Sequence, residues 1–289
     1  MSGIARSGEP VPAAVEADYE SCLSCNACRS VCTMHVATNR LPPLKLLRMA
    51  ALGMVEPLLA SVELWYCLQC NQCTATCPMS VKPSLLIRRL RSEALGRGLV
   101  SDETLVRFEQ LEASFQRVRW HMIAQRAEGA RLAQMADDWR RWSETPIEPL
   151  AEALPLSRSG AEPPDDELEA CLGFSADFAA CMTCGACTTA CPVTHDRAVY
   201  DPVTFFRMVN LGAKEELLRS PSLWLCLGCQ ACTNACSQQV AGHLVMRGLQ
   251  DLSQSRGLVP ADVRAWLWSI DHALLPRYLQ EVDVLFQTG

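Results

Sequence analysis

The apolar residues of the chain recur at the spacing of amphipathic helices. In the first such stretch they stand three or four positions apart, at Leu44, Leu47, Ala51 and Val55. Pro57 is expected to end or kink that helix, because proline lacks the backbone donor a helix interior needs. A short second helix is then expected from about Leu58.

The same pattern returns further along the chain. It recurs at Leu86, Ile87, Leu90 and Ala94, and again at Val203, Phe206 and Val209. No convincing run of period-two alternation, the pattern of a half-buried strand, is found anywhere. The pattern therefore predicts an all-α protein.

Apolar positions at helical spacing also continue from Glu103 to Trp142, which predicts long amphipathic helices. Residues 143–169 are rich in proline, serine and acidic residues and are expected to form an exposed linker. The string WLWSIDHALLPRYLQ at 266–280 predicts another helix, with an interruption at Pro276. Packing on their own domain and docking to a partner protein both remain open for these helices.

The chain repeats itself with a shift of 159 positions and no gap. Residues 22–100 match 181–259, for instance at Trp65 and Trp224, and the string RGLV closes both copies. Such self-similarity indicates a tandem duplication. We expect one domain at 14–102, a helical connector and linker at 103–169, a second domain at 170–262, and a C-terminal helix at 263–289.

Cysteine is the residue that sets this chain apart from ordinary globular proteins. The chain has 289 residues and 17 cysteines, with 49% hydrophobic and 20% charged residues. The first 20 residues lack the pattern of a secretory signal, and no stretch of 18 uninterrupted apolar residues exists. We therefore expect a cytoplasmic protein without a transmembrane segment of its own, which meets a membrane only through a partner. Thiols stay reduced there, so the cysteines point to metal rather than to disulfides.

Sixteen of the cysteines form four groups with the spacing CxxCxxCxxxC. The groups are Cys22, Cys25, Cys28 and Cys32; Cys67, Cys70, Cys73 and Cys77; Cys181, Cys184, Cys187 and Cys191; and Cys226, Cys229, Cys232 and Cys236. This run is typical of cubane iron–sulfur clusters, in which the fourth cysteine ligates the neighbouring cluster. The sequence thus predicts four [4Fe–4S] clusters.

Crossed ligation assigns three cysteines of one group and the last cysteine of its partner group to each cluster. The expected sets are Cys22, Cys25, Cys28 with Cys77; Cys67, Cys70, Cys73 with Cys32; Cys181, Cys184, Cys187 with Cys236; and Cys226, Cys229, Cys232 with Cys191. Zinc is the alternative, since four-cysteine zinc sites also use CxxC pairs, but zinc gains nothing from longer runs. Cys171 stands outside the pattern and is interpreted as a buried free thiol.

Several residues near the cysteines have two possible roles. Trp65 and Trp224 are interpreted as apolar shields of the clusters, with a role in electron transfer as the alternative. His35 and His195 either donate hydrogen bonds that raise a cluster's potential or are ordinary histidines. Arginines follow the second group at Arg88, Arg89, Arg91 and Arg97, either as a solvated helix face or as a docking patch.

The net charge of −6 makes nucleic acid an unsuitable partner. No Cys-Cys dipeptide and no GxGxxG fingerprint occur, so a twin-cysteine catalytic site and a dinucleotide site are not indicated. With all sixteen cysteines as ligands, no iron is left open for substrate. No catalytic residue is therefore predicted.

Paired CxxCxxCxxxC groups separated by 34 residues, the Leu-Trp-x-Cys start of the second group, and VKPSLLIRR at 81–89 together resemble the C subunit of heterodisulfide reductase. The resemblance covers 22–100 and 181–259 and implies two tandem α-helical ferredoxin domains. It further implies an electron-transfer subunit that relays electrons between a flavoprotein and a catalytic oxidoreductase subunit. The same module occurs in iron–sulfur subunits of quinone-linked membrane enzymes, which is the alternative. A third class, clusters with only a structural or sensing role, predicts clusters that are not reducible.

Overall fold

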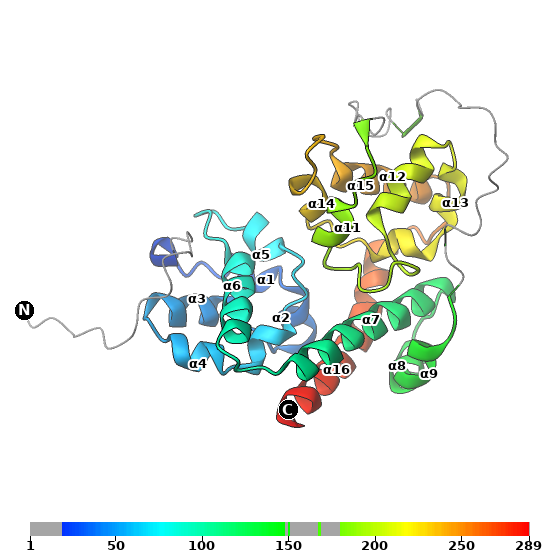
Figure 1. Ribbon diagram of the computed structural model, residues 1–289. Coiled ribbons are helices and arrows are strands. Elements are labelled where there is room, and N and C mark those ends of the chain that lie inside the picture. The colour runs from blue at the N-terminus through cyan, green and yellow to red at the C-terminus, as the bar shows by residue number, and fades with distance from the viewer. Residues whose placement is uncertain (1–18, 148–149, 151–166, 169–179, 289) are drawn as a thin grey trace, which may run out of the picture. The chain divides into compact units, whose positions relative to one another are not determined.

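The computed structural model describes residues 19–147, 150, 167–168 and 180–288, and every regular element within these ranges is a helix (Figure 1). The prediction of an all-α fold is confirmed. The chain divides into two compact units. Unit 1 runs to Phe108 and includes the C-terminal segment from Tyr278, and unit 2 comprises Glu109–Arg277. The domain boundaries predicted from the sequence stay a prediction beside this division.

Unit 1 is built from short helices around the first two cysteine groups. They are the 3-10 helix η1 (Tyr19–Ser21), α1 (Ala27–Ser30), α2 (Thr33–Thr38), α3 (Pro43–Ala51), α4 (Val55–Leu59), the 3-10 helix η2 (Val62–Tyr66), α5 (Gln72–Ala75) and α6 (Pro83–Gly96). Helices α3 and α4 pack on α6, whose Leu86, Ile87 and Leu90 are buried. The apolar stripe read from the sequence is thus the core of this unit.

Unit 2 has helices at most of the equivalent positions around the other two groups, but no helix corresponds to α2. It contains α8 (Ala130–Asp137), α9 (Trp139–Glu144), α11 (Ala186–Ala190), α12 (Pro202–Asn210), α13 (Lys214–Arg219), the 3-10 helix η5 (Pro221–Leu225), α14 (Ala231–Asn234) and α15 (Gly242–Ser255). Two longer helices, α7 (Asp102–Ala124) and α16 (Val263–Thr288), contribute residues to both units. The helices predicted between Glu103 and Trp142 are therefore present, whereas most of the predicted linker lies outside the described residues.

The break between the first two helices of the repeat differs from the prediction. Helix α3 ends at Ala51, Gly53 adopts a φ of 69°, and α4 already begins at Val55. Pro57 lies in the first turn of α4, where a helix does not use its backbone donors. The left-handed glycine, rather than the proline, therefore separates the helices, and Gly212 repeats this conformation with a φ of 71°.

The predicted interruption at Pro276 was wrong, because α16 continues through it. Proline removes one helical hydrogen bond and crowds the preceding turn. The residues around it are nevertheless firmly buried, with Leu274, Leu275 and Tyr278 all at 0% exposure. Burial of this apolar face outweighs the missing bond.

Aromatic packing encloses the Leu-Trp segment of unit 1. Trp65 is 3% exposed, stacks on Phe286 at a centroid distance of 4.8 Å, and meets the edge of Phe108 at 5.3 Å. The neighbouring Tyr66 hydroxyl is hydrogen bonded to both Arg40 and Asp283. Side chains of α7 and α16 thus cover the segment that leads into Cys67, which fits the predicted shielding role.

Unit 2 encloses its own Leu-Trp segment with polar contacts from α7. The Trp120 indole donates to Ser222 Oγ at 2.9 Å, and the Arg119 guanidinium donates to the Leu225 carbonyl at 3.2 Å. Arg119 is 5% exposed and pairs with Asp271 of α16 at 2.9 Å. Trp224 itself is 6% exposed. Helix α7 therefore contacts the Leu-Trp segment in both copies, but through different residues.

Candidate metal centres

The loop around the second cysteine has the same backbone in all four groups. The residues on both sides of that cysteine adopt positive φ angles of 54–81°: Ser24 and Asn26, Gln69 and Asn71, Thr183 and Gly185, and Gly228 and Gln230. This conformation turns the chain tightly around the second cysteine of each group. Six of these eight residues are not glycine, and such residues adopt it at a cost that surrounding interactions must offset.

The third cysteine of each group lies on a short helix and the fourth lies just beyond it. Cys28, Cys73, Cys187 and Cys232 stand on α1, α5, α11 and α14, respectively. Cys32 and Cys191 then follow in extended backbone, with φ angles of −75° and −78°. The fourth cysteine is thereby carried away from its own group.

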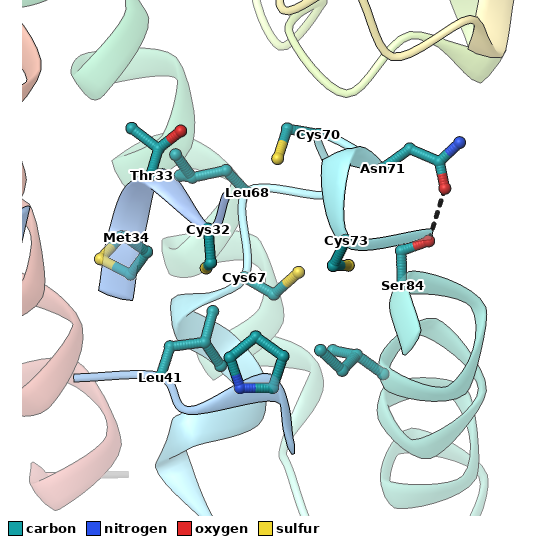
Figure 2. Close-up of a pocket in the computed structure, with 12 residues that line it drawn as sticks. Cys32, Thr33, Met34, Leu41, Cys67, Leu68, Cys70, Asn71, Cys73 and Ser84 are labelled. Atoms are coloured by element: carbon teal, nitrogen blue, oxygen red, sulfur yellow. Dashed lines mark hydrogen bonds between the residues drawn. The ribbon is translucent and has the colours of Figure 1, made fainter. Parts of the chain in front are cut away.

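In unit 1 the structure brings Cys32 together with the second group. A mostly apolar cavity is lined by Cys32, Cys67, Cys70 and Cys73, along with residues such as Leu41 and Ile87 (Figure 2). Asn71, in the loop of this group, accepts a hydrogen bond from Ser84 of α6 at 2.6 Å. Cys32 comes from one group and the other three cysteines from its partner group, in the combination expected for crossed ligation.

In the other sets, the charge of one thiol shifts the pKa of another. This electrostatic influence indicates which thiols lie near each other. Cys28 is influenced by Cys22, Cys25 and Cys77. In unit 2, Cys232 is influenced by Cys226, Cys229 and Cys191. For the last predicted set, the structure gives such an influence of Cys181 on Cys187. The fourth cysteine again lies near the partner group in the first two of these sets.

The buried thiols of these sets stay protonated at neutral pH unless a cation binds them. Burial, reinforced by neighbouring cysteines, raises the pKa of Cys32 to about 11 and that of Cys73 to about 12. The same causes raise the pKa of Cys191 to about 11 and that of Cys232 to about 12. Sulfur is a soft donor, and sets of cysteine sulfurs suit iron–sulfur clusters. Among the described residues, no three such side chains converge closely enough to hold a single metal ion.

Backbone and side-chain donors surround the first cysteine of the second group. The Gln69 N–H donates to Cys67 Sγ at 3.4 Å, and in unit 2 the Gly228 N–H donates to Cys226 Sγ at 3.5 Å. In unit 1 the Arg91 guanidinium also donates to the Cys67 carbonyl at 2.7 Å. Arg91 therefore belongs to this site rather than to a solvated arginine face.

The imidazoles of the two predicted histidines do not contact a cysteine sulfur in the interactions that the structure gives. His35 receives a hydrogen bond from Arg29 and is bonded to the Arg40 carbonyl at 3.1 Å. His195 is bonded to the Pro192 carbonyl at 3.0 Å and lies 3.5 Å from Glu112. It is the backbone N–H of His35, and not its ring, that donates to Cys32. Cys171, the predicted free thiol, lies outside the described residues.

The start of α15 leaves no room for a side chain at Gly242. A Cβ there would lie 2.5 Å from Phe206 Cζ and 3.1 Å from Cys232 Sγ. In unit 1, Pro83 stands in the place of Gly242 and Leu47 in the place of Phe206. The first position thus carries a larger residue in unit 1, and the second position carries a smaller one. The pair at 206 and 242 is therefore packed directly against a cysteine of the site.

Gly242→Ala is expected to destabilise unit 2 and weaken its binding of metal. Overpacking of a buried site costs about 1–3 kcal/mol, which lowers the melting temperature by roughly 2–12 °C for a chain of this size. Phe206→Leu in the same chain should restore most of the loss, because it removes the ring that the new methyl group meets. Thermal unfolding of the metal-loaded protein measures both effects.

Gly96→Ala is the matched control, because no atom lies within 4 Å of a Cβ at that helical glycine. It should leave the melting temperature unchanged or slightly raised. A Gly242→Ala protein that melts with the wild type would show that the contact with Phe206 and Cys232 relaxes without cost.

Two domain matches cover the cysteine groups. Models of a 4Fe-4S dicluster domain match residues 21–82 and residues 177–240. Each match contains both groups of one copy, so the duplicated iron–sulfur module predicted from the sequence is confirmed.

Curated relatives resemble the chain over one such module. The C subunit of the H2:CoB-CoM heterodisulfide,ferredoxin reductase of Methanothermobacter thermautotrophicus is 33% identical over 75 residues, 26% of this chain and 39% of the relative. A protein of Archaeoglobus profundus described as similar to the C subunit of heterodisulfide reductase is 33% identical over 72 residues, 25% of this chain and 38% of the relative. The iron–sulfur C subunit of the CoB–CoM heterodisulfide reductase of Methanopyrus kandleri is 31% identical over 78 residues, 27% and 40% of the two chains. The matched part of the chain spans about two fifths of the length of these relatives.

No solved structure matches the chain. Among the described helices, none combines the length and the apolar character that crossing a bilayer requires.

Proposed function

We propose that this chain, an iron–sulfur protein similar to the C subunit of heterodisulfide reductase, is the electron-transfer subunit of a multi-subunit oxidoreductase. It holds four [4Fe–4S] clusters and relays electrons between a flavoprotein and a catalytic subunit. The observation that carries the proposal is the cavity in which Cys32 of one group meets Cys67, Cys70 and Cys73 of the next. That combination is the one a two-cluster module uses.

The proposed ligands are the four crossed sets of sixteen cysteines. They are Cys22, Cys25, Cys28 and Cys77; Cys67, Cys70, Cys73 and Cys32; Cys181, Cys184, Cys187 and Cys236; and Cys226, Cys229, Cys232 and Cys191. When bound, each cluster supplies a one-electron redox centre. Because every cysteine of the four groups is engaged, substrate chemistry takes place on a partner subunit.

The chain's own residues exclude water and hold the sulfurs in place. Trp65 and Trp224 are buried two residues before Cys67 and Cys226, which supports a role as apolar shields of these ligands. Backbone N–H groups of the cysteine loops donate to the sulfurs, which favours the more negative, reduced state. This protein environment is what tunes the potential of such a site.

Exposure of the first group in each unit suits exchange of electrons with partners. Cys25 and Cys184, the second cysteines of those groups, are exposed. Leu23 and Met182, the equivalent residues beside them, are 68% and 61% exposed. A partner can approach one redox site of each copy closely, whereas Cys67 and Cys73 of the second group in unit 1 are buried.

Anaerobic purification of the native protein with whatever accompanies it tests this function. We expect a flavoprotein and a subunit with twin-cysteine motifs in stoichiometric amounts. The comparison variant has Cys22, Cys25 and Cys28 replaced by alanine and so lacks one cluster site. Electron flow through its complex should be weaker than through the wild-type complex. Recovery with a membrane quinone-binding protein instead would support the quinone-linked alternative and contradict the proposal.

A further inference from the structure

A threonine hydroxyl joins the helix of the third cysteine to the start of the following helix in both units. In unit 1, Thr74 Oγ1 of α5 is hydrogen bonded to Ser84 Oγ of α6 at 2.7 Å and accepts the Ser84 backbone N–H at 3.2 Å. In unit 2, Thr233 Oγ1 of α14 is bonded to His243 Nδ1 of α15 at 2.7 Å and accepts the His243 backbone N–H at 3.1 Å. A shift of 159 positions relates the two pairs. The copies thus share the contact, but unit 2 has an imidazole where unit 1 has a hydroxyl.

This position borders a proposed cluster site in each copy. Ser84 lines the cavity of the second cysteine group in unit 1 (Figure 2). In unit 2, Thr233 directly follows Cys232 on α14. Gly242, the residue before His243, would place a Cβ only 3.1 Å from the Cys232 sulfur. The imidazole of His243 is therefore tied to the edge of the site through a threonine, and not through a cysteine.

The ring of His243 can take up a proton without losing this contact. Its side chain is half-buried, so one part of it meets solvent. A hydroxyl oxygen has two lone pairs, and Thr233 Oγ1 can accept both the backbone N–H and the Nδ1–H of His243. In that tautomer Nε2 carries the lone pair that binds a proton, while the hydrogen bond at Nδ1 persists.

The surroundings of His243 keep its ring neutral as long as no further negative charge appears. His243 stands in the first turn of α15, where the helix dipole disfavours a cation. Burial, followed by the charge of Arg247 on the same helix, also lowers the pKa of His243. Arg247 is paired with Asp251 at 3.8 Å on the surface of α15.

The helices packed on α15 add little charge around this ring. Helix α14 holds Cys232 as its one titratable residue, η5 holds none, and α12 holds Arg207, which is exposed. Helix α13 meets the far end of α15, where Glu215 pairs with Arg256 at 2.6 Å. The charged residues of α13 are Lys214, Glu215, Glu216 and Arg219. An electron on the cluster would therefore be the main change of charge near His243.

We propose that His243 binds a proton when the neighbouring cluster of unit 2 accepts an electron. One electron enters the cluster, one proton passes from solvent to Nε2, and both leave again on reoxidation. Reduction then leaves the net charge of this site unchanged, whereas the equivalent site of unit 1, with Ser84, takes up an electron alone. The inference rests on the proposed function, because it requires a reducible cluster beside Cys232.

The pH dependence of the reduction potential tests this coupling. The added electron raises the pKa of the imidazole, so a proton is taken up at pH values between the pKa of the oxidised state and that of the reduced state. Within that window the ratio of reduced to oxidised cluster at a fixed ambient potential should fall by up to about tenfold per unit rise in pH, or about 59 mV for a one-electron couple. Potentiometry of the anaerobic protein with electron paramagnetic resonance, between about pH 5 and pH 8, should show this dependence for one cluster.

His243→Ser installs the residue that unit 1 carries at this position and keeps a hydroxyl group for Thr233. The variant should retain its iron and lose the pH dependence of that cluster. His272→Gln is the matched control, because His272 lies on α16, where its ring is bonded to the Trp268 carbonyl at 2.9 Å. It should behave as the wild type. A pH dependence that survives in His243→Ser, or that disappears equally in His272→Gln, would overturn the inference.

Arg247→Gln keeps the test decisive if His243→Ser loses iron. The Arg247 side chain is 67% exposed, so its replacement leaves the core intact. Loss of the cation raises the pKa of His243, and the window of pH dependence should move to higher pH. A window that stays in place in the fully loaded variant would contradict the role of His243.

The wild-type protein separates failure of this inference from failure of the proposed function. Fully loaded, reducible clusters whose potentials do not change with pH would overturn the role of His243 and leave the proposed relay standing. Protein without reducible clusters would overturn the proposed function itself, and this inference with it.

Discussion

Replacing Cys32 and Cys70 together by alanine is expected to remove one cluster and leave the other three intact. The two cysteines belong to different groups in the sequence but line the same cavity. A cluster that loses two of its four ligands is not retained, so iron should fall from about sixteen to about twelve atoms per chain. Iron and sulfide analysis with electron paramagnetic resonance of the reduced protein measures the loss.

Replacing Cys77 and Cys70 together is the matched comparison, because these two cysteines belong to the same group. Crossed ligation places them on different clusters, since Cys77 lies near Cys28 rather than with Cys70. Both clusters of unit 1 should then be altered, and only the two of unit 2 should keep the wild-type signals. The variant should therefore be the more severe of the pair.

The opposite order would contradict crossed ligation. If each group held its own cluster, the pair Cys70 and Cys77 would cost one cluster, and the pair Cys32 and Cys70 would disturb two. Both variants remove the same number of cysteines and share Cys70. General loss of stability consequently cannot mimic the predicted difference.

Local patterns explain how much of the fold could be predicted. The helical spacing of Leu86, Ile87 and Leu90 records which face is buried, and these residues are buried in α6. The shift of 159 positions carries that prediction to the second copy without further information. Spacing also predicted the paired cysteine groups that the two dicluster-domain matches cover, whereas the assignment of single cysteines to clusters stays a prediction.

The errors arose where burial or backbone conformation overrode the preferences of single residues. Pro276 was expected to interrupt α16, but the burial of Leu274 and Leu275 keeps the helix continuous. Pro57 was expected to end a helix that Gly53 had already ended, because the position of a proline within the first turn cannot be read from its presence alone.

The contact of Arg91 with the Cys67 carbonyl was missed because the two residues are distant in the sequence. Arg91 reads as one member of a basic helix face, and only the fold shows that it reaches the Cys67 carbonyl.

The second large effect concerns the electron capacity of the chain. The four proposed ligand sets, which leave no iron open for a substrate, predict that each bound cluster accepts one electron reversibly. Clusters with a purely structural role would instead stay oxidised across the physiological range. The number of electrons taken up per chain therefore separates a relay from a scaffold.

Coulometric reduction of the anaerobically purified wild-type chain, with iron measured on the same sample, tests this claim most directly. The relay predicts uptake of about four electrons per chain with about sixteen irons, and full recovery on reoxidation. Fully loaded protein that accepts no electron in the physiological range, or cysteines that hold zinc in place of iron, would contradict it.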